Sequence, residues 1–175
     1  MRDLPTPTLP LSTPALRGPS PARPAVDAAG IQVGWARHQD EVRAAQRLRY
    51  EVFAGEMGAR LSTPVAGHDI DLFDDFCEHL LVRDEATREV IGTYRVLTPA
   101  QARRVGSTYS DTEFDLTRLR DLRERMVELG RSCVHPDHRQ GGVIMALWRW
   151  SACTQLRPSS TMRSRTVRRL SLIHI

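Results

Sequence analysis

The segment ELGRSCVHP at residues 128–136 leads into HRQGG at residues 138–142 and then into the mostly apolar VIMALWRW at residues 143–150. The first part predicts a buried strand that stops near Pro136, and the last part predicts a helix that begins at the paired glycines. A helix N-terminus behind a glycine turn binds anions, because unpaired backbone N–H groups and the helix dipole point at the ligand. We therefore expect Arg139, Gly141 and Gly142 to hold a phosphate, such as that of a phosphopantetheine.

Two charged residues, Glu128 and Arg131, lie inside the predicted strand, where a purely structural core would carry apolar side chains. On an ideal strand they point to opposite faces. A β-bulge at Gly130 would bring them to one face and free a backbone N–H group. We interpret both as catalytic, with Glu128 accepting a proton from an amine and the freed N–H stabilising an oxyanion. The alternative is a structural ion pair between Glu128 and Arg131.

The chain divides into three zones by composition. Residues 1–28 hold seven of the eleven prolines and few large apolar residues, so this segment is expected to be disordered. Residues 29–152 form the folded domain. Residues 153–175 carry five arginines and no acid and show no clear periodicity. For this tail two interpretations remain open: disorder, or sequence that has left its proper reading frame near Cys153.

Within the folded zone the hydrophobic pattern predicts strands and helices in a definite order. The first strand covers residues 31–35, and a helix follows over residues 38–57. Two strands at 78–84 and 89–97 form an antiparallel hairpin. A short helix at 98–104 is followed by an irregular stretch to residue 120, and the strand 126–134 precedes the helix that begins at Gly142.

Composition limits the class of protein. The 175 residues are 41% hydrophobic, and no apolar run approaches the roughly 20 residues that a membrane helix requires. The N-terminus lacks the apolar core of a signal peptide, and the three cysteines have no CxxC spacing, which favours the cytoplasm, with peripheral association at the inner membrane left open. All 25 basic residues are arginine, and without the tail's +5 the net charge of +4 becomes −1, so nothing points to specific nucleic-acid binding.

Four short motifs in this order resemble the GNAT superfamily of N-acyltransferases. They are RYEVF at 49–53, DLFD at 71–74, IGTYRVL at 91–97 and ELGR at 128–131. The finer match is to the ornithine-lipid N-acyltransferases (hemolysin-like acyltransferases) and the related acyl-homoserine lactone synthases. The resemblance implies an α/β (α+β) fold, with a mixed, mainly antiparallel sheet flanked by helices. It also implies further strands after the last helix, and because none can be read here we expect the sheet to be incomplete.

The resemblance also assigns roles to residues in these motifs. It places Arg49 and Phe53 at the acceptor and acyl entrance, while a solvated Arg beside a core Phe is the alternative. It implies that the carboxylates of Asp71 and Asp74 bind the cationic amino groups of ornithine. The competing interpretation is that these are solvent-facing loop acids, like the neighbouring acids at positions 69 and 75.

Three further features bear on ligands. Arg95 interrupts an apolar strand, and we expect it to contact a carboxylate or the pantetheine phosphate. The glycine loop departs from the usual GNAT pattern at Ile144, which suits a carrier-protein donor better than coenzyme A. No metal and no other cofactor are expected, because His135 and His138 lack a third ligand. A docking surface for acyl carrier protein is expected on Arg103, Arg104, Arg118, Arg120, Arg123 and Arg125, although a solvated basic face would look the same.

Three functions are consistent with these observations. The first is an L-ornithine N(alpha)-acyltransferase that moves a 3-hydroxyacyl group from acyl carrier protein to ornithine and forms a lyso-ornithine lipid. The second is an acyl-homoserine lactone synthase, although the tryptophan of that family is not evident after Phe53. The third is a truncated, inactive fragment whose basic tail binds anions without specificity.

Overall fold

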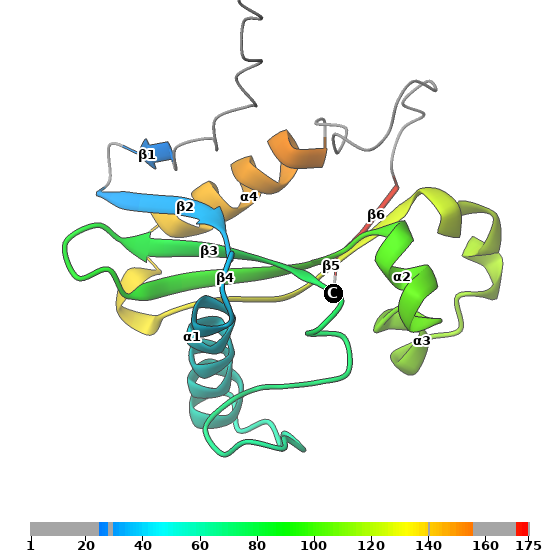
Figure 1. Ribbon diagram of the computed structural model, residues 1–175, viewed down its shortest axis with the longest axis horizontal. Coiled ribbons are helices and arrows are strands. Elements are labelled where there is room, and N and C mark those ends of the chain that lie inside the picture. Colours follow the sequence, from blue (N-terminus) through cyan, green and yellow to red (C-terminus); the bar gives the residue numbers. More distant parts are fainter. Residues whose placement is uncertain (1–24, 28–29, 140, 156–170, 175) are drawn as a thin grey trace, which may run out of the picture.

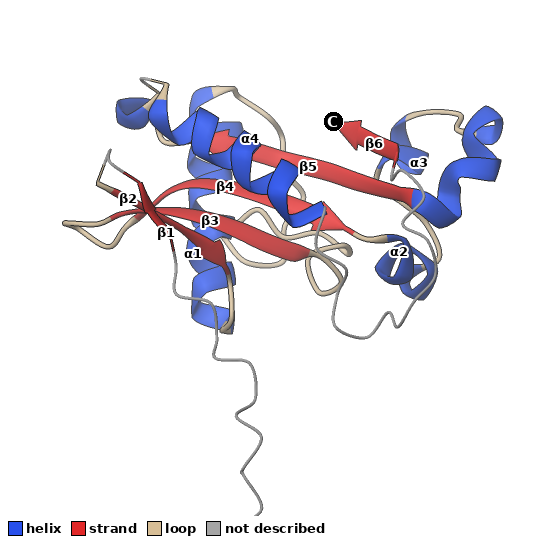
Figure 2. Cartoon of the chain, turned by 90° about the horizontal axis from the view of Figure 1, so that it is seen from above, coloured by secondary structure: helices blue, strands red, loops and turns tan. Residues whose placement is uncertain are grey.

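The computed structural model of the protein describes residues 25–27, 30–139, 141–155 and 171–174. A twisted sheet forms the centre, with helix α1 (Gln39–Tyr50) on one face and helix α4 (Gly142–Gln155) on the other (Figure 1). Helices α2 (Pro99–Val105) and α3 (Ser110–Glu113) lie beyond one end of the sheet, as the second view shows (Figure 2). The mixed α/β architecture with a mainly antiparallel sheet agrees with the expectation from sequence.

The sheet has six strands in the order β1-β2-β3-β4-β5-β6. Neighbours from β1 to β5 pair antiparallel, and β6 pairs parallel with β5. The predicted central strands are confirmed, and the second hairpin strand begins one residue later than expected. The strands are β1 Ala25–Asp27, β2 Ile31–Trp35, β3 Glu78–Asp84, β4 Val90–Leu97, β5 Met126–Val134 and β6 Ser171–His174.

Two strands were not expected from sequence. Residues 25–27 lie inside the proline-rich segment and pair with residues 31–33 of β2, while 1–24 and 28–29 lie outside the described residues. The expectation that no strand follows the last helix is wrong for residues 171–174, which pair with residues 126–129 of β5. Helix α4 also continues past Cys153 to Gln155. Both strands are held by backbone pairing, which hydrophobic periodicity does not report.

The helix predicted over residues 38–57 consists of α1 and a wider π-type helix, η1 (Glu51–Glu56), that continues it. The Glu41 carboxylate accepts hydrogen bonds from the Arg37 and His38 backbone N–H groups, which fixes the first turn. Leu48 and Val52 are buried and, together with Cys133, form a small core beneath the sheet. π-type turns occur often at functional sites, and here the turn carries Phe53.

The stretch up to residue 120, expected to be irregular, contains helix α3 and the beginning of the 3₁₀ helix η2 (Thr117–Arg125), so that prediction is wrong. Polar side chains rather than an apolar stripe specify these short elements. The Asp111 carboxylate accepts hydrogen bonds from the Thr108 N–H and hydroxyl, and the Asp115 carboxylate accepts from Thr117 in the same way. Such side-chain caps leave no helical period in the hydrophobic pattern.

Helix α4 approaches the sheet closely at Gly92 of β4. A Cβ atom at this position would lie 2.8 Å from Val143 Cγ1 and 3.4 Å from Val82 Cβ. The glycine therefore allows Val143 and Leu147 to reach the main core between the helix and the sheet. None of the helices in the described ranges combines the length and the apolarity needed to cross a membrane.

Candidate active site

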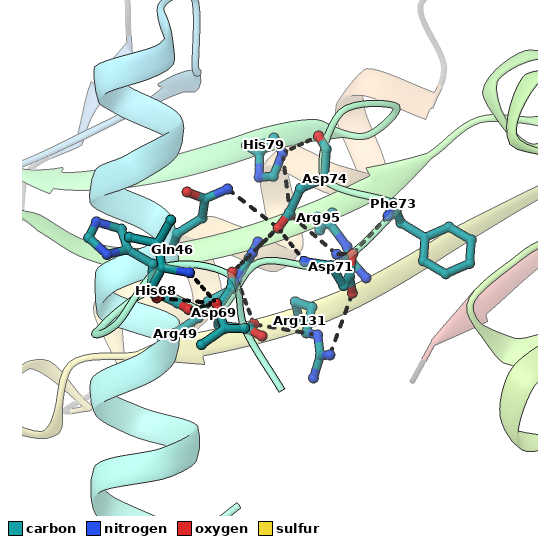
Figure 3. Close-up of polar contacts among 12 residues, drawn as sticks. Gln46, Arg49, His68, Asp69, Asp71, Phe73, Asp74, His79, Arg95 and Arg131 are labelled. Carbon is teal, nitrogen blue, oxygen red and sulfur yellow. Dashed lines mark hydrogen bonds and ion pairs between the residues drawn. The ribbon is translucent and has the colours of Figure 1, made fainter. Parts of the chain in front are cut away.

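Three arginines and three aspartates gather beneath the middle of the sheet, on the side that faces α1 (Figure 3). Helix α1, strands β4 and β5 and the loop before β3 contribute these residues. We call them the ion-pair cluster: Arg49, Arg95, Arg131, Asp69, Asp71 and Asp74. Their formal charges cancel, which a buried group of charges requires.

Arg49 is at the centre of the cluster and is fully buried, at 0% exposure. Its Nη2 donates to the Asp69 carbonyl oxygen at 2.5 Å and to both Asp74 carboxylate oxygens at 2.8 Å. Its Nε lies 2.9 Å from Asp69 Oδ2, close enough for an ion pair but outside hydrogen-bond geometry. The alternative of a solvated arginine at this position is therefore wrong.

Asp69 and Asp74 are equally enclosed, whereas the side chain of Asp71 is 22% exposed. Asp74 is 6% exposed, and its carboxylate also accepts hydrogen bonds from the Asp71 N–H at 3.2 Å and from Gln46 Nε2 at 3.4 Å. Asp69 is buried as well. The competing interpretation of solvent-facing loop acids is therefore wrong for Asp69 and Asp74, although Asp75 is exposed. The fold therefore uses Asp74 to hold arginines in place.

Arg95 belongs to the ion-pair cluster and also lines the cavity that lies above the cluster. Its Nη1 lies 2.6 Å from Asp71 Oδ1 and 3.2 Å from Asp74 Oδ1. Burial works against the charged form of Asp71, yet the hydrogen bond from Arg95 and the positive charges of Arg95 and Arg131 bring the pKa of Asp71 below its ordinary value. Both arginines therefore have their guanidinium groups oriented before any ligand arrives.

A cavity of about 340 Å³ lies above the cluster. Four predicted site residues line it, and Arg49, Asp71 and Asp74 are not among its lining residues. The lining consists of Phe53, Phe73, Cys77, Arg95, Leu97, Tyr109, Glu128, Gly130, Arg131 and Ser132. The structure thus brings Phe53, Arg95, Glu128 and Arg131 to one cavity.

A β-bulge in β5 shapes the cavity wall. Thr93 of β4 pairs with Cys133, whereas Arg95 pairs with Gly130, so a single residue of β4 faces both Arg131 and Ser132. Arg131 adopts φ 50°, in the left-handed region that favours glycine. The bulge predicted from sequence is present, one residue further along than Gly130, and Glu128 and Arg131 reach the same cavity.

Glu128 and Arg131 nevertheless do not form the ion pair considered as an alternative. Arg131 lies 3.5 Å from carboxylate oxygens of Asp69 and of Asp71. Glu128, only 5% exposed, accepts hydrogen bonds from the Tyr109 N–H at 2.8 Å, the Ser110 N–H at 2.7 Å and the Ser110 hydroxyl. The ion-pair alternative is wrong because each of the two residues has other partners.

Tyr109 is a cavity residue that the sequence analysis missed. Its ring centroid lies 5.0 Å from the Arg131 guanidinium carbon and 5.9 Å from that of Arg95. The ring also meets Phe73 edge to face at a centroid distance of 6.0 Å. These contacts join distant parts of the chain, so no local pattern indicates them; the SDTE segment at 110–113 only hints at a helix start.

The predicted phosphate loop contacts η1, the helix that also carries Phe53. Arg139 Nε donates to the Val134 carbonyl oxygen at 3.2 Å, and the Nη1 and Nη2 groups form a two-pronged ion pair with Glu56 at 2.6 and 2.5 Å. Gly141 has φ 85° and its carbonyl oxygen accepts from the Met145 N–H as α4 begins. A carboxylate thus occupies the guanidinium fork that a phosphate would use.

The cysteines and histidines offer little further chemistry. Burial raises the pKa of the Cys77 and Cys133 thiols to about 12, so both are neutral near pH 7 and poor nucleophiles. The His135 and His138 rings lie 5.6 Å apart. Among residues 25–27, 30–139, 141–155 and 171–174, no three His, Cys, Asp or Glu side chains group as metal ligands would.

Comparison with known proteins finds a matching domain family and curated proteins of similar sequence. The profile of the Acetyltransferase (GNAT) domain matches residues 48–149. The L-ornithine N(alpha)-acyltransferase of Rhodobacter capsulatus is 42% identical over 126 residues, which cover 67% of this chain and 48% of that protein. The enzyme of the same name from Brucella abortus is 40% identical over 134 residues, covering 70% of this chain and 48% of that protein. The chain therefore spans about half the length of these curated relatives.

A solved structure also matches. The CoA-dependent acyl-homoserine lactone synthase BjaI, determined with SAM and isopentyl-CoA, aligns with a TM-score of 0.48 and 23% sequence identity. The alignment covers 67% of this chain and 56% of that one.

Proposed function

Because the chain belongs to the Acetyltransferase (GNAT) domain family, we propose that it acts in an L-ornithine N(alpha)-acyltransferase. The reaction moves a 3-hydroxyacyl group from acyl carrier protein to the α-amino group of ornithine and yields a lyso-ornithine lipid. The proposal rests on one observation: a chain that is about 40% identical to ornithine acyltransferases contains, within the matched GNAT domain at residues 48–149, a cavity with two oriented guanidinium groups.

The acceptor amino acid fits the polar side of this cavity. Arg95 and Arg131 line it and are held from below by Asp71, so they present fixed positive charge toward the ornithine carboxylate. Asp71 and Asp74 then act on ornithine through these arginines, and Arg49 supports the same arrangement from α1. Phe53 contributes an apolar wall, with its ring 5.7 Å from the Arg131 guanidinium carbon.

The chemical step is attack of the neutral α-amine on the thioester carbonyl carbon. The C–N bond forms, the C–S bond breaks, the amine loses a proton, and the phosphopantetheine sulfur leaves and takes up a proton. Arg131 and Ser132 lie outside the regular strand register, and we assign their backbone N–H groups to the developing oxyanion. Three hydrogen bonds hold the Glu128 carboxylate, which leaves one lone-pair site on Oε2 where a proton can be accepted.

The donor is proposed to bind at the other end of the site. Arg139, Gly141 and Gly142 take the phosphopantetheine phosphate, which displaces Glu56 from Arg139. The carrier protein docks on the arginines near α2 and η2. Arg104 stacks on Phe76, Arg123 is paired with Asp111 and Arg125 is half-buried, which leaves three exposed residues for the partner: Arg103, Arg118 and Arg120.

The direct test incubates the purified chain with a 3-hydroxyacyl carrier-protein thioester and L-ornithine and detects the product by mass spectrometry. We expect an N-acylated ornithine, and its loss in Arg131→Gln. The matched control, Arg43→Gln, removes an exposed charge on α1 outside the cavity and should retain activity. A product formed with S-adenosylmethionine instead of ornithine would support the lactone synthase. No product with either acceptor would support an inactive fragment.

A further inference from the structure

We propose that Glu128 is a positioning residue that clamps Tyr109 against the cavity, and that the Tyr109 ring contacts the acyl group of the donor. The inference rests on the proposed acyltransferase function and assigns two new roles within it. Tyr109 becomes a residue that determines donor specificity, and Ser110 becomes part of its support. The carboxylate, the two backbone amides and the ring form one unit, which we call the Glu128 clasp.

The hydrogen bonds of Glu128 carry the first part of the argument. Both carboxylate oxygens are engaged, Oε2 by the Tyr109 N–H at 2.8 Å and Oε1 by the Ser110 N–H at 2.7 Å and the Ser110 hydroxyl. Glu128 is 5% exposed and Ser110 is 1% exposed, so water does not compete for these bonds. Hydrogen bonds to a buried charged acceptor are strong and orient both partners. The clasp therefore fixes residues 109–110 on strand β5.

The second part is what the fixed residue does. The Tyr109 ring lies within cation–π distance of Arg131, at 5.0 Å, and of Arg95, at 5.9 Å. The Phe53 ring also lies 5.7 Å from the Arg131 guanidinium carbon, so two aromatic rings contact this side chain. The strained φ of 50° at Arg131 needs such support to persist. Moving Tyr109 would release the guanidinium that is proposed to bind ornithine.

The third part concerns the ligand. Tyr109, Phe53, Phe73 and Leu97 add apolar side chains to the cavity lining, next to its guanidinium groups. An acyl chain is the part of the substrates that is apolar, and aromatic rings bind methylene groups well. The Tyr109 hydroxyl donates to Glu113 at 3.1 Å, and we assign to the acyl carbons the part of the ring that lines the cavity and that the guanidinium groups of Arg131 and Arg95 leave uncovered.

The variants follow from these contacts. Tyr109→Ala removes the ring, whereas Tyr109→Phe keeps it and serves as the control. Glu128→Gln is nearly the same size, but its amide nitrogen must face a backbone N–H donor, so the clasp loosens. Because small displacements in an active site cost up to about 100-fold, we expect Tyr109→Ala and Glu128→Gln each to lower kcat/KM for the thioester about tenfold or more, and Tyr109→Phe to stay within about twofold. Glu124→Gln removes the same charge at an exposed position and should have no effect.

Two readouts separate positioning from proton transfer. If Glu128 acts through Tyr109, the effects of Glu128→Gln and Tyr109→Ala are not additive, and the double variant resembles Tyr109→Ala alone. The shape of the kcat pH profile should be unchanged in Glu128→Gln. Loss of its acidic limb would overturn the proposal and make Glu128 the base. Additive effects, or normal kcat/KM in Tyr109→Ala, would overturn it as well.

Amide hydrogen exchange tests the clasp without substrate. The Tyr109 and Ser110 N–H groups should exchange slowly in the unaltered chain, and at least one of them should exchange at least about tenfold faster in Glu128→Gln, because the glutamine amide retains a single acceptor oxygen. Protection that survives the substitution would overturn the clasp. If the chain transfers no acyl group to ornithine, the proposed function fails, and the exchange rates still decide whether Glu128 holds residues 109–110.

Discussion

The ion-pair cluster and the phosphate loop both contain arginine–carboxylate pairs, and the surroundings of these pairs differ. In the ion-pair cluster, Arg49 and Asp74 have side-chain exposures of 1% and 3% and share further partners. In the phosphate loop, Arg139 and Glu56 form an ion pair through two contacts of 2.6 and 2.5 Å, and their side chains are 41% and 42% exposed. Both pairs join a guanidinium group to a carboxylate group, and they differ in how far their side chains are buried.

This difference in burial separates support from binding. A buried charge that loses its partner remains without solvation, so each member of the cluster is needed to keep the others in place. An exposed pair exchanges with water and ions at little cost, so Arg139 can release Glu56 for a phosphate. The cluster is therefore suited to hold the cavity rigid, and the loop pair is suited to change partners.

The largest effect is expected from breaking the cluster at its centre. Arg49→Met leaves Asp69 and Asp74 without their closest cation, and removal of one partner from a buried pair costs about 3–5 kcal/mol. Urea unfolding of the variant should show this loss or a failure to fold.

Asp74→Asn and Asp75→Asn provide a matched comparison for that prediction. The first neutralises a buried acid that binds Arg49 and Arg95, and the second neutralises its exposed neighbour. Equal stabilities for these two variants would contradict the supporting role of the cluster.

A second effect concerns pH. Burial lowers the pKa of His79, which lies beside Asp74, below its ordinary value of 6.5. The unfolded chain therefore takes up a proton that the folded chain does not, and stability should fall as pH drops through 6.5. The melting temperature should decline from pH 7 to 5.5, and the decline should be smaller in His79→Gln than in the control His68→Gln.

Protonation of aspartates also lowers the stability of the folded chain, but at lower pH than protonation of His79. Asp71 has a lowered pKa, so its contribution to stability is present above 3.8 and is lost as pH falls below that value. Asp111, whose hydrogen bond from Arg123 lowers its pKa to about 2, behaves likewise. A stability that stayed constant from pH 4 to pH 2 would contradict these ion pairs.

A smaller change in stability is expected at the phosphate loop. Arg139→Gln breaks an exposed pair, so the free energy of unfolding should change by less than about 1 kcal/mol. The KM for the acyl carrier thioester should nevertheless rise, because a bidentate phosphate contact is lost. A loss of stability as large as that of Arg49→Met would erase the distinction between the two regions.

The smallest effect is expected from Glu56→Gln. This change removes the carboxylate that competes for Arg139, so inorganic phosphate should inhibit the variant at somewhat lower concentration, by about fivefold at most. High salt should reduce the difference between variant and parent chain, because exposed charges are screened. Weaker phosphate inhibition in Glu56→Gln would show that Glu56 does not compete.

Much of the fold follows from local pattern alone. Short apolar runs on either side of a polar turn predict β3 and β4, helical spacing predicts α1, and the paired glycines mark the beginning of α4. Charged residues inside apolar strands also identify Arg95, Glu128 and Arg131 as cavity residues, because a core without function would not contain them. These features depend on near neighbours in the chain.

What only the tertiary structure decides is the partner of each charge. The sequence suggests that Glu128 faces Arg131, but Glu128 binds residues 109–110, and Arg131 binds aspartates from the loop before β3. Tyr109 enters the cavity through the same contacts. Hydrogen bonds and ion pairs between distant segments depend on how the chain packs, and electrostatic attraction alone does not specify which opposite charge will be nearest.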